Sequence, residues 1–211
     1  PLEVAMQVSV ITRAGTERVM RFAFEMARQR NGKKRVTAAT KSNALNHSMP
    51  LWDEIFAEVS AKYPDIEPSK FHVDALSMQL IKQPEYFDVI VATSMFGDIL
   101  SDEAAMIAGG LGIAPGANLN PERQHPSMFE PIHGSAPDIA GKGIANPTAT
   151  ILAARMMLGW LGEEEAGLLV EKAVDAVMAE GRVRTRDLGG SSTTSEVGDA
   201  VCEKLAQLAG R

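Results

Sequence analysis

The first half of the chain alternates short apolar segments with longer amphipathic ones, and this alternation constrains the fold more than any other feature. Three short segments have the apolar, partly β-branched composition of buried strands: residues 35–39, 71–73 and 87–93. Four longer segments repeat apolar residues at the three- and four-residue spacing of helices: 16–30, 50–63, 75–82 and 98–108. Strands and helices that alternate through short connections predict an α/β fold, with an open sheet that carries helices on both faces.

The start of the chain carries three further expectations. Residues 2–12 alternate apolar with other side chains or are apolar throughout, which indicates an additional strand before the first helix. We expect Thr16 to cap that helix. The chain opens with Pro1 rather than methionine, and no turn precedes the strand, so we expect it to represent part of a longer protein.

The second half is organised differently. Residues 112–143 are rich in Gly, Pro, Asn and Ser, and they show no strand or helix pattern. Structureless loops of more than about 15 residues are uncommon in compact domains and are usually functional. Three helical patterns follow, at residues 147–161, 163–179 and 194–208. We expect the large apolar residues of the first two of these helices to pack in a core: Met156, Met157, Leu158, Leu161 and Leu168.

The formal net charge of −6 and the single cysteine limit the partners and sites that the chain can have. An acidic chain gives no electrostatic reason to bind nucleic acid or an anionic membrane, and no apolar run reaches the ~20 residues of a membrane-spanning helix. Cys202 alone excludes an intrachain disulfide and a thiolate-rich metal site, and it fits a reducing, cytoplasmic location. Motifs of serine hydrolases, phosphate-binding loops and zinc proteases are absent from the sequence.

Three aspartates stand where predicted strands pass into helices. Asp98 and Asp102 are four residues apart, so both carboxylates project from one helical face beyond the C-terminal end of a strand. Hard oxygen ligands of this kind suit Mg²⁺ or Mn²⁺, and Asp74 would complete a set of three carboxylates. The spacing leaves ordinary alternatives open, because Asp74 and Asp98 can cap helices and Asp102 can be a solvated charge.

Two further segments carry candidate chemistry. Lys41 follows a predicted strand, where a lysine beside a metal-bound hydroxyl can transfer a proton, although a surface lysine at a turn fits equally well. Residues 130–147, EPIHGSAPDIAGKGIANP, contain small residues that allow a ligand close to the backbone. In this segment Asp138 would accept hydrogen bonds from ribose hydroxyls and repel the 2′-phosphate of NADP. No Gly-x-Gly-x-x-Gly follows a strand, so an ordinary Rossmann site is not indicated, and a turn-rich structural loop is the alternative.

Two long motifs resemble the hallmark segments of the β-decarboxylating dehydrogenases, the family of isocitrate, isopropylmalate, D-malate and tartrate dehydrogenases. They are FGDILSD at residues 96–102 and HGSAPDIAGKGIANP at residues 133–147, and the similarity extends over nearly the whole chain, including DLGG at residues 187–190. The resemblance implies an isopropylmalate-dehydrogenase-like fold. Residues 1–108 would belong to the dimer-forming, metal-binding domain, and residues 109–211 to the C-terminal part of the cofactor-binding domain.

The resemblance also implies a site shared between the subunits of a homodimer. A divalent cation, Mg²⁺ or Mn²⁺, would bind Asp98 and Asp102 of one subunit together with Asp74 of the other. Lys41 would reach across the same interface and assist removal of the substrate's hydroxyl proton, so Lys41 and Asp74 are the expected catalytic residues. The implied cofactor is NAD, with Asn43 near the nicotinamide and the adenosine half contacted by His133, Gly134, Ser135, Ala136, Asp138 and Asn146.

The implied reaction is oxidation of a small 2-hydroxy acid, followed by decarboxylation when the product carries a β-carboxylate. Three segments look most like the tartrate and D-malate branch: ATKSN at 39–43, NLNPER at 118–123 and PSMFEP at 126–131. The alternatives are a 3-isopropylmalate dehydrogenase and a non-catalytic chain that keeps only the dimer and cofactor surfaces. The arginines that bind substrate carboxylates in the family, and its catalytic tyrosine, have no counterpart here. We therefore expect the N-terminal part of the fold to be missing and the 211-residue chain alone to be inactive.

Overall fold

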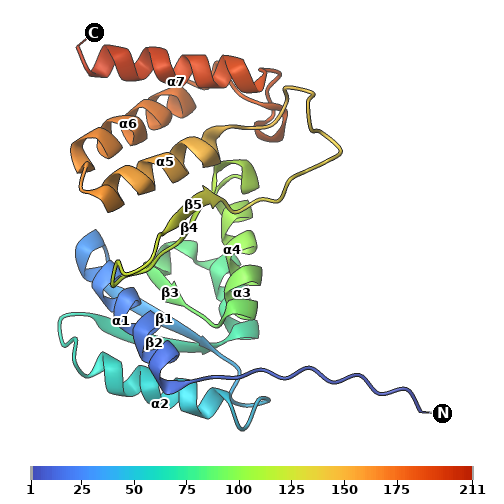
Figure 1. Ribbon diagram of the computed structural model, residues 1–211, viewed down its shortest axis with the longest axis vertical. Helices are drawn as coiled ribbons and strands as arrows, with labels where there is room; N and C mark the ends of the chain where they lie inside the picture. The colour runs from blue at the N-terminus through green and yellow to red at the C-terminus, as the bar shows by residue number, and fades with distance from the viewer. Residues whose placement is uncertain (1, 211) are drawn as a thin grey trace. The chain divides into compact units, whose positions relative to one another are not determined.

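The computed structural model describes residues 2–210, and the chain divides into two compact units, Pro1–Ala104 and Ala105–Arg211. The first unit is built on a parallel sheet of three strands (Figure 1). The central strand β1 (Arg35–Thr40) pairs on one side with β2 (Glu67–His72) and on the other with β3 (Val89–Val91). Strands β1 and β2 end level, because Thr40 lies opposite His72 in the register. The residues that follow these two strands therefore emerge at the same edge of the sheet.

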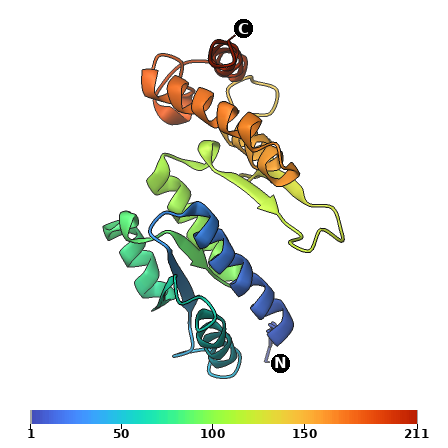
Figure 2. The ribbon, with the colours of Figure 1, turned by 90° about the vertical axis from the view of Figure 1, so that its left-hand side faces the viewer.

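Helices cover both faces of this sheet, as the alternation of elements predicts (Figures 1 and 2). Val36 and Ala38 of β1 belong to a core shared with α1 and α2, whereas Ala39 belongs to a second core shared with α3 and α4. Successive residues of a strand point to opposite faces, so one buried strand supports both layers. The bounds of the four helices are α1 (Arg13–Arg30), α2 (Met49–Ser60), α3 (Val73–Lys82) and α4 (Ser94–Ala108).

Two expectations for the start of the chain are wrong. Residues 2–12 form no strand, and the apolar side chains of residues 2, 4, 6, 8 and 10 are 79–97% exposed. Their alternating pattern suits a strand, but strand formation requires a neighbouring strand to pair with, and residues 2–12 pair with none of the described residues. The cap of α1 is Thr12, whose hydroxyl accepts a hydrogen bond from the Gly15 amide at 3.2 Å, whereas Thr16 is buried inside the helix.

The second unit combines an antiparallel strand pair with three helices. Strands β4 (Pro115–Asn118) and β5 (Met128–Pro131) lie within the stretch expected to be structureless, so that expectation is wrong. Helix α6 (Glu164–Glu180) contacts both α5 (Thr148–Leu161) and α7 (Thr194–Leu208) (Figure 1). Short 3₁₀ turns at Pro84–Tyr86, Leu111–Ile113 and Arg186–Leu188 complete the two units.

The expected core of α5 and α6 is only partly observed. Met156 and Leu158 are half-buried, but Met157, Leu161 and Leu168 are 40%, 62% and 40% exposed. The two helices approach closely at Gly167, where an added Cβ would lie 3.2 Å from the Arg155 carbonyl oxygen. Small residues and the ion pairs of Arg155 with two glutamates occupy this contact, so the longer apolar side chains flank it.

Candidate active site

Lys41 and Asp74 form an ion pair at the edge of the sheet where β1 and β2 end. Lys41 follows the last residue of β1, and Asp74 lies in the first turn of α3, two residues after the end of β2. Because the two strands end level, the Lys41 Nζ atom lies 2.7 Å from Asp74 Oδ1. The hydrogen bond from Lys41 is the main cause that lowers the pKa of the Asp74 carboxyl, and backbone hydrogen bonds lower it further. Sequence reasoning placed both residues at strand ends, and the structure brings them together.

The capping alternative is wrong for Asp74. The cap position of α3 is His72, and Asp74 is the second residue of the helix proper. Its carboxylate is 64% exposed, whereas the Lys41 side chain is 25% exposed. An ion pair with so exposed a carboxylate contributes little stability, so a different cation can replace Lys41 beside Asp74.

Asp98 and Asp102 lie on α4, which begins at Ser94. Asp98 is therefore the fifth helical residue and does not cap the helix, so the capping alternative is wrong here as well. Both aspartates are exposed, and neither side chain makes an ion pair or hydrogen bond with another of residues 2–210. Within this described part of a single chain, no three acidic, histidine or cysteine side chains come close enough to hold a metal ion. One chain thus presents two carboxylates on α4 and a separate third on α3.

The two helices that carry these acids also expose large apolar side chains. On α3, Met78 and Ile81 stand four and seven residues after Asp74, at the spacing of one helical face, and both are 65% exposed. On α4, Met95 and Ile99 are 64% and 60% exposed, and Ile99 lies between the two aspartates in the sequence. Exposed apolar residues are ordinary when scattered, but a group of them marks an interaction surface.

The segment expected to bind a cofactor follows β5 in the second unit. Gly134, Ser135 and Asp138 are exposed, and Ala136 has the left-handed φ of 42° that a non-glycine residue rarely adopts. The end of the segment is attached to the first turn of α7: Thr194 donates from its amide to the Gly143 carbonyl at 2.9 Å, and from its hydroxyl to the Ala145 carbonyl at 2.6 Å. Helix α7 thus supports a loop whose small side chains leave its backbone accessible.

Asn146 is more constrained than its sequence context suggests. It is 8% exposed, its amide donates to Asp187 Oδ2 at 3.0 Å, and its side-chain oxygen accepts from the Thr148 amide at 3.0 Å. Its side chain therefore already has partners within the chain and orders the start of α5. Asp187, the first residue of the DLGG motif, was not singled out from the sequence. The DLGG motif was the only sequence feature that pointed to Asp187.

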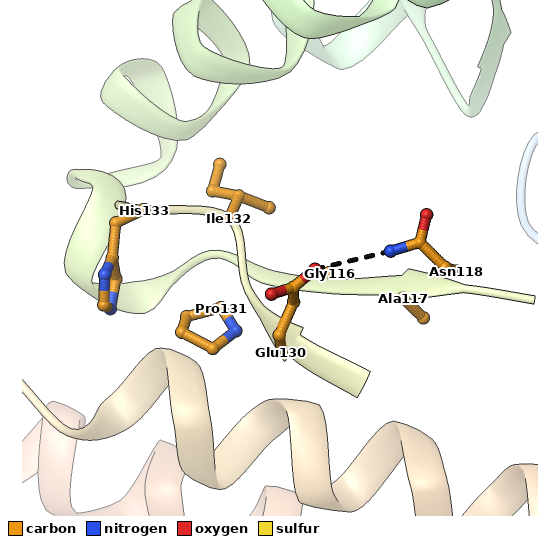
Figure 3. A pocket seen from close by; sticks show the side chains of 7 residues that line it. All are labelled: Gly116, Ala117, Asn118, Glu130, Pro131, Ile132 and His133. Carbon is orange, nitrogen blue, oxygen red and sulfur yellow. Dashed lines mark hydrogen bonds between the residues drawn. The ribbon is translucent and has the colours of Figure 1, made fainter. Parts of the chain in front are cut away.

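A shallow cavity of about 280 Å³ opens on the β4–β5 pair (Figure 3). Asn118 and Glu130 face each other across the strands, with 3.3 Å between Asn118 Nδ2 and Glu130 Oε1. His133 lines the end of the cavity that leads into the candidate cofactor segment, and its Nδ1 lies 2.9 Å from the Gly134 carbonyl oxygen. The remaining lining residues are Gly116, Ala117, Pro131 and Ile132.

Asn43 and Asp53 complete the surroundings of Lys41. Asn43 is exposed in the turn after β1, on the same segment as Lys41. Asp53 projects from α2 and accepts a hydrogen bond from the Ser42 hydroxyl at 2.9 Å. Sequence reasoning missed Asp53, because a single acid on an amphipathic helix is usually a solvated one. Its position beside the buried Trp52 was the only signal.

Known proteins of one family are similar to this chain. The family described as isocitrate/isopropylmalate dehydrogenase matches residues 1–201. A probable tartrate dehydrogenase/decarboxylase of Bacillus subtilis is 53% identical over 98% of this chain and 57% of its own length. The decarboxylating D-malate dehydrogenase of Escherichia coli is 50% identical over 95% of this chain and 56% of its own length.

A solved structure shows the same fold. The isocitrate dehydrogenase of Methylococcus capsulatus superposes with a TM-score of 0.89 at 47% identity, over 94% of this chain and 58% of that one. The chain thus spans a little more than half the length of the relatives that it matches.

Proposed function

Because the chain belongs to the isocitrate/isopropylmalate dehydrogenase family, we propose that it takes part in the NAD- and metal-dependent oxidation of a 2-hydroxy acid. The proposed substrate is D-malate or tartrate, the acids after which the Bacillus subtilis and Escherichia coli relatives are named. The observation that carries the proposal is the Lys41–Asp74 pair, which stands at the carboxyl edge of the sheet, where open α/β folds bind ligands. 3-Isopropylmalate is the alternative substrate.

The acidic side chains fit a hard divalent cation. Asp98 and Asp102 offer four carboxylate oxygens on one helical face, and their mutual repulsion is relieved when a cation binds between them. Asp74 offers a third carboxylate, which a single chain keeps separate from the other two. Mg²⁺ or Mn²⁺ held by all three requires Asp74 to come from a second subunit.

A homodimer supplies that geometry. The apolar residues on the exposed faces of α3 and α4 accompany Asp74 on one helix, and Asp98 and Asp102 on the other. A second copy of the chain that covers these faces would bury the apolar side chains and carry its own Lys41 and Asp74 with them. The same contact would therefore form the dimer and complete two equivalent sites.

The candidate cofactor segment fits NAD. The exposed small residues Gly134 and Ser135 admit a dinucleotide close to the backbone, and Asp138 is exposed and able to accept hydrogen bonds from the adenosine ribose. The same carboxylate would repel the 2′-phosphate of NADP. Because the Asn146 side chain is already bonded to Asp187 and Thr148, we assign the contact with adenine to its backbone.

When bound, the cation would supply Lewis acidity toward the substrate's hydroxyl, and NAD⁺ would supply an acceptor for hydride. We assign transfer of the hydroxyl proton to Lys41 Nζ, which Asp74 orients from 2.7 Å away. The balanced products are a 2-keto acid, NADH and a proton. A keto acid with a carboxylate on its β-carbon then loses CO₂, so D-malate would yield pyruvate.

The test is NADH formation from D-malate, tartrate and 3-isopropylmalate, each with and without Mn²⁺. Two forms are compared: the 211-residue chain, and a chimera in which the unmatched residues of the Bacillus subtilis relative precede Pro1. We expect Mn²⁺-dependent turnover of D-malate or tartrate by the chimera alone. Lys41→Met should abolish that turnover, whereas the control Lys62→Met, which changes another lysine beyond the end of α2, should not. An active Lys41→Met chimera would disprove the role of Lys41, and turnover of 3-isopropylmalate alone would assign the alternative substrate.

A further inference from the structure

The carboxylate of Asp53 stands at a junction of three elements next to Lys41. It projects from α2 and is only 15% exposed. Its Oδ2 atom accepts one hydrogen bond from the Ser42 hydroxyl at 2.9 Å and another from Lys70 Nζ at 2.8 Å. Ser42 follows β1 and Lys70 lies on β2, so a single carboxylate joins α2 to both strands that end beside the Lys41–Asp74 pair.

This carboxylate is charged despite its burial. Burial by itself raises the pKa of Asp53, but the hydrogen bonds and the positive charge of Lys70 outweigh it, so that the net pKa is lowered. The hydroxyl of Thr40, the last residue of β1, lies beside this carboxylate and also lowers its pKa, although neither Asp53 Oδ1 nor Thr40 Oγ1 makes a hydrogen bond of full geometry among residues 2–210. A buried carboxylate costs folding free energy, and its contacts here are made to the segment that carries Lys41.

The backbone around Lys41 shows what the Ser42–Asp53 bond constrains. The Lys41 carbonyl accepts hydrogen bonds from the Ala44 amide at 3.0 Å and the Leu45 amide at 2.8 Å, which closes a tight turn directly after β1. Residues 43–47 of this turn are exposed and lack core contacts. The Ser42 side chain is therefore the point at which the turn is attached to a buried group.

We propose that Asp53 is a positioning residue: through Ser42 it fixes the turn after β1, and so holds Lys41 in place to pair with Asp74 and meet the substrate. This inference rests on the role proposed above for Lys41. Within residues 2–210 Asp53 makes no hydrogen bond or ion pair with Lys41 or with the candidate metal-binding acids, so it acts on Lys41 through the neighbouring residues.

Two variants and two matched controls test the proposal. Ser42→Ala removes one hydroxyl and should fold even if Asp53→Asn does not. Ser60→Ala removes a hydroxyl at the far end of α2, and Glu54→Gln neutralises the exposed acid next to Asp53. The first readout is hydrogen exchange at the Ala44 and Leu45 amides of the 211-residue chain, resolved by NMR. Both test variants should speed this exchange about 10-fold, the factor expected when one hydrogen bond to a charged group is lost. Amides within β1 should keep their wild-type rates, as should all amides of the controls.

The second readout separates positioning from mere stability. In the chimera, Ser42→Ala and Asp53→Asn should lower kcat about 10-fold and leave the KM for NAD unchanged, while the controls keep wild-type kcat. Unchanged exchange at Ala44 and Leu45, or unchanged kcat in an active chimera, would overturn the proposal. If the wild-type chimera turns over no hydroxy acid, the proposed function fails. The exchange rates then decide alone whether Asp53 fixes the Lys41 turn.

Discussion

Replacing Ile99 with serine should weaken the proposed homodimer by a predictable amount. Burying an isoleucine side chain completely contributes about 1.5–3 kcal/mol. Ile99 is 60% exposed in the single chain, so a partner subunit can remove at most that fraction of the side chain from water, for ~1–2 kcal/mol. An interface with two-fold symmetry contains the residue twice, and the loss becomes ~2–4 kcal/mol per dimer. The dissociation constant should rise about 30- to 1000-fold.

Sedimentation velocity over a dilution series measures that constant directly. The control is Val19→Ser, which removes a 39% exposed side chain from α1, on the opposite face of the sheet, and should leave the constant unchanged. An Ile99→Ser dissociation constant within about threefold of wild type would refute the assignment of this face. So would a wild-type chain that remains monomeric at every concentration.

Three further predictions concern the cofactor, the core and a helix cap. In the chimera, Asp138→Asn should raise the NADP-to-NAD ratio of kcat/KM about 10-fold, because the charge that repels the 2′-phosphate is removed, and an unchanged ratio in initial-rate assays would contradict this. Phe24→Ala should lower the free energy of unfolding in urea by ~3–5 kcal/mol, because the ring is fully buried and its centroid lies 4.9 Å from that of Tyr63. A decrease below ~1 kcal/mol would contradict this packing. Hydrogen bonds from the Thr193 backbone and side chain lower the pKa of Glu196 from its ordinary 4.5, so its stabilising contribution is present above that value and lost as the pH falls further. Melting temperatures between about pH 3 and pH 6 should therefore fall more steeply for the wild type than for Glu196→Gln, and parallel curves would exclude this contribution.

The sequence predicts the first unit well because its elements obey local rules. Residues 36–40 are β-branched or small and buried on both faces, as expected of a central parallel strand. The β4–β5 pair could not be predicted in this way: PGAN and MFEP have neither the composition nor the alternation of strands, and their pairing is set by tertiary contact. Residues 2–12 show the converse case: their pattern suits a strand, but they pair with no strand among residues 2–210.

The candidate site is predictable to a similar extent. The sequence placed Lys41 and Asp74 each directly after a strand, but their pairing appears only in the structure, where the two strands end level. The side-chain hydrogen bonds of Asn146 and Asp53 could not be predicted, because each depends on a partner distant in the sequence or on burial. A sequence motif indicates which residues belong to a site, whereas the hydrogen bonds that hold their side chains in place are seen only in the structure.

Mixing two inactive forms of the active chimera tests the shared site most directly. Lys41→Met/Asp74→Asn keeps the α4 carboxylates, and Asp98→Asn/Asp102→Asn keeps the Lys41–Asp74 pair. Each form alone should be inactive. Random re-pairing yields about half mixed dimers, each with one intact site of two, so NADH formation should recover to about a quarter of the wild-type rate. No recovery in mixtures shown to contain mixed dimers would contradict a site built from two subunits.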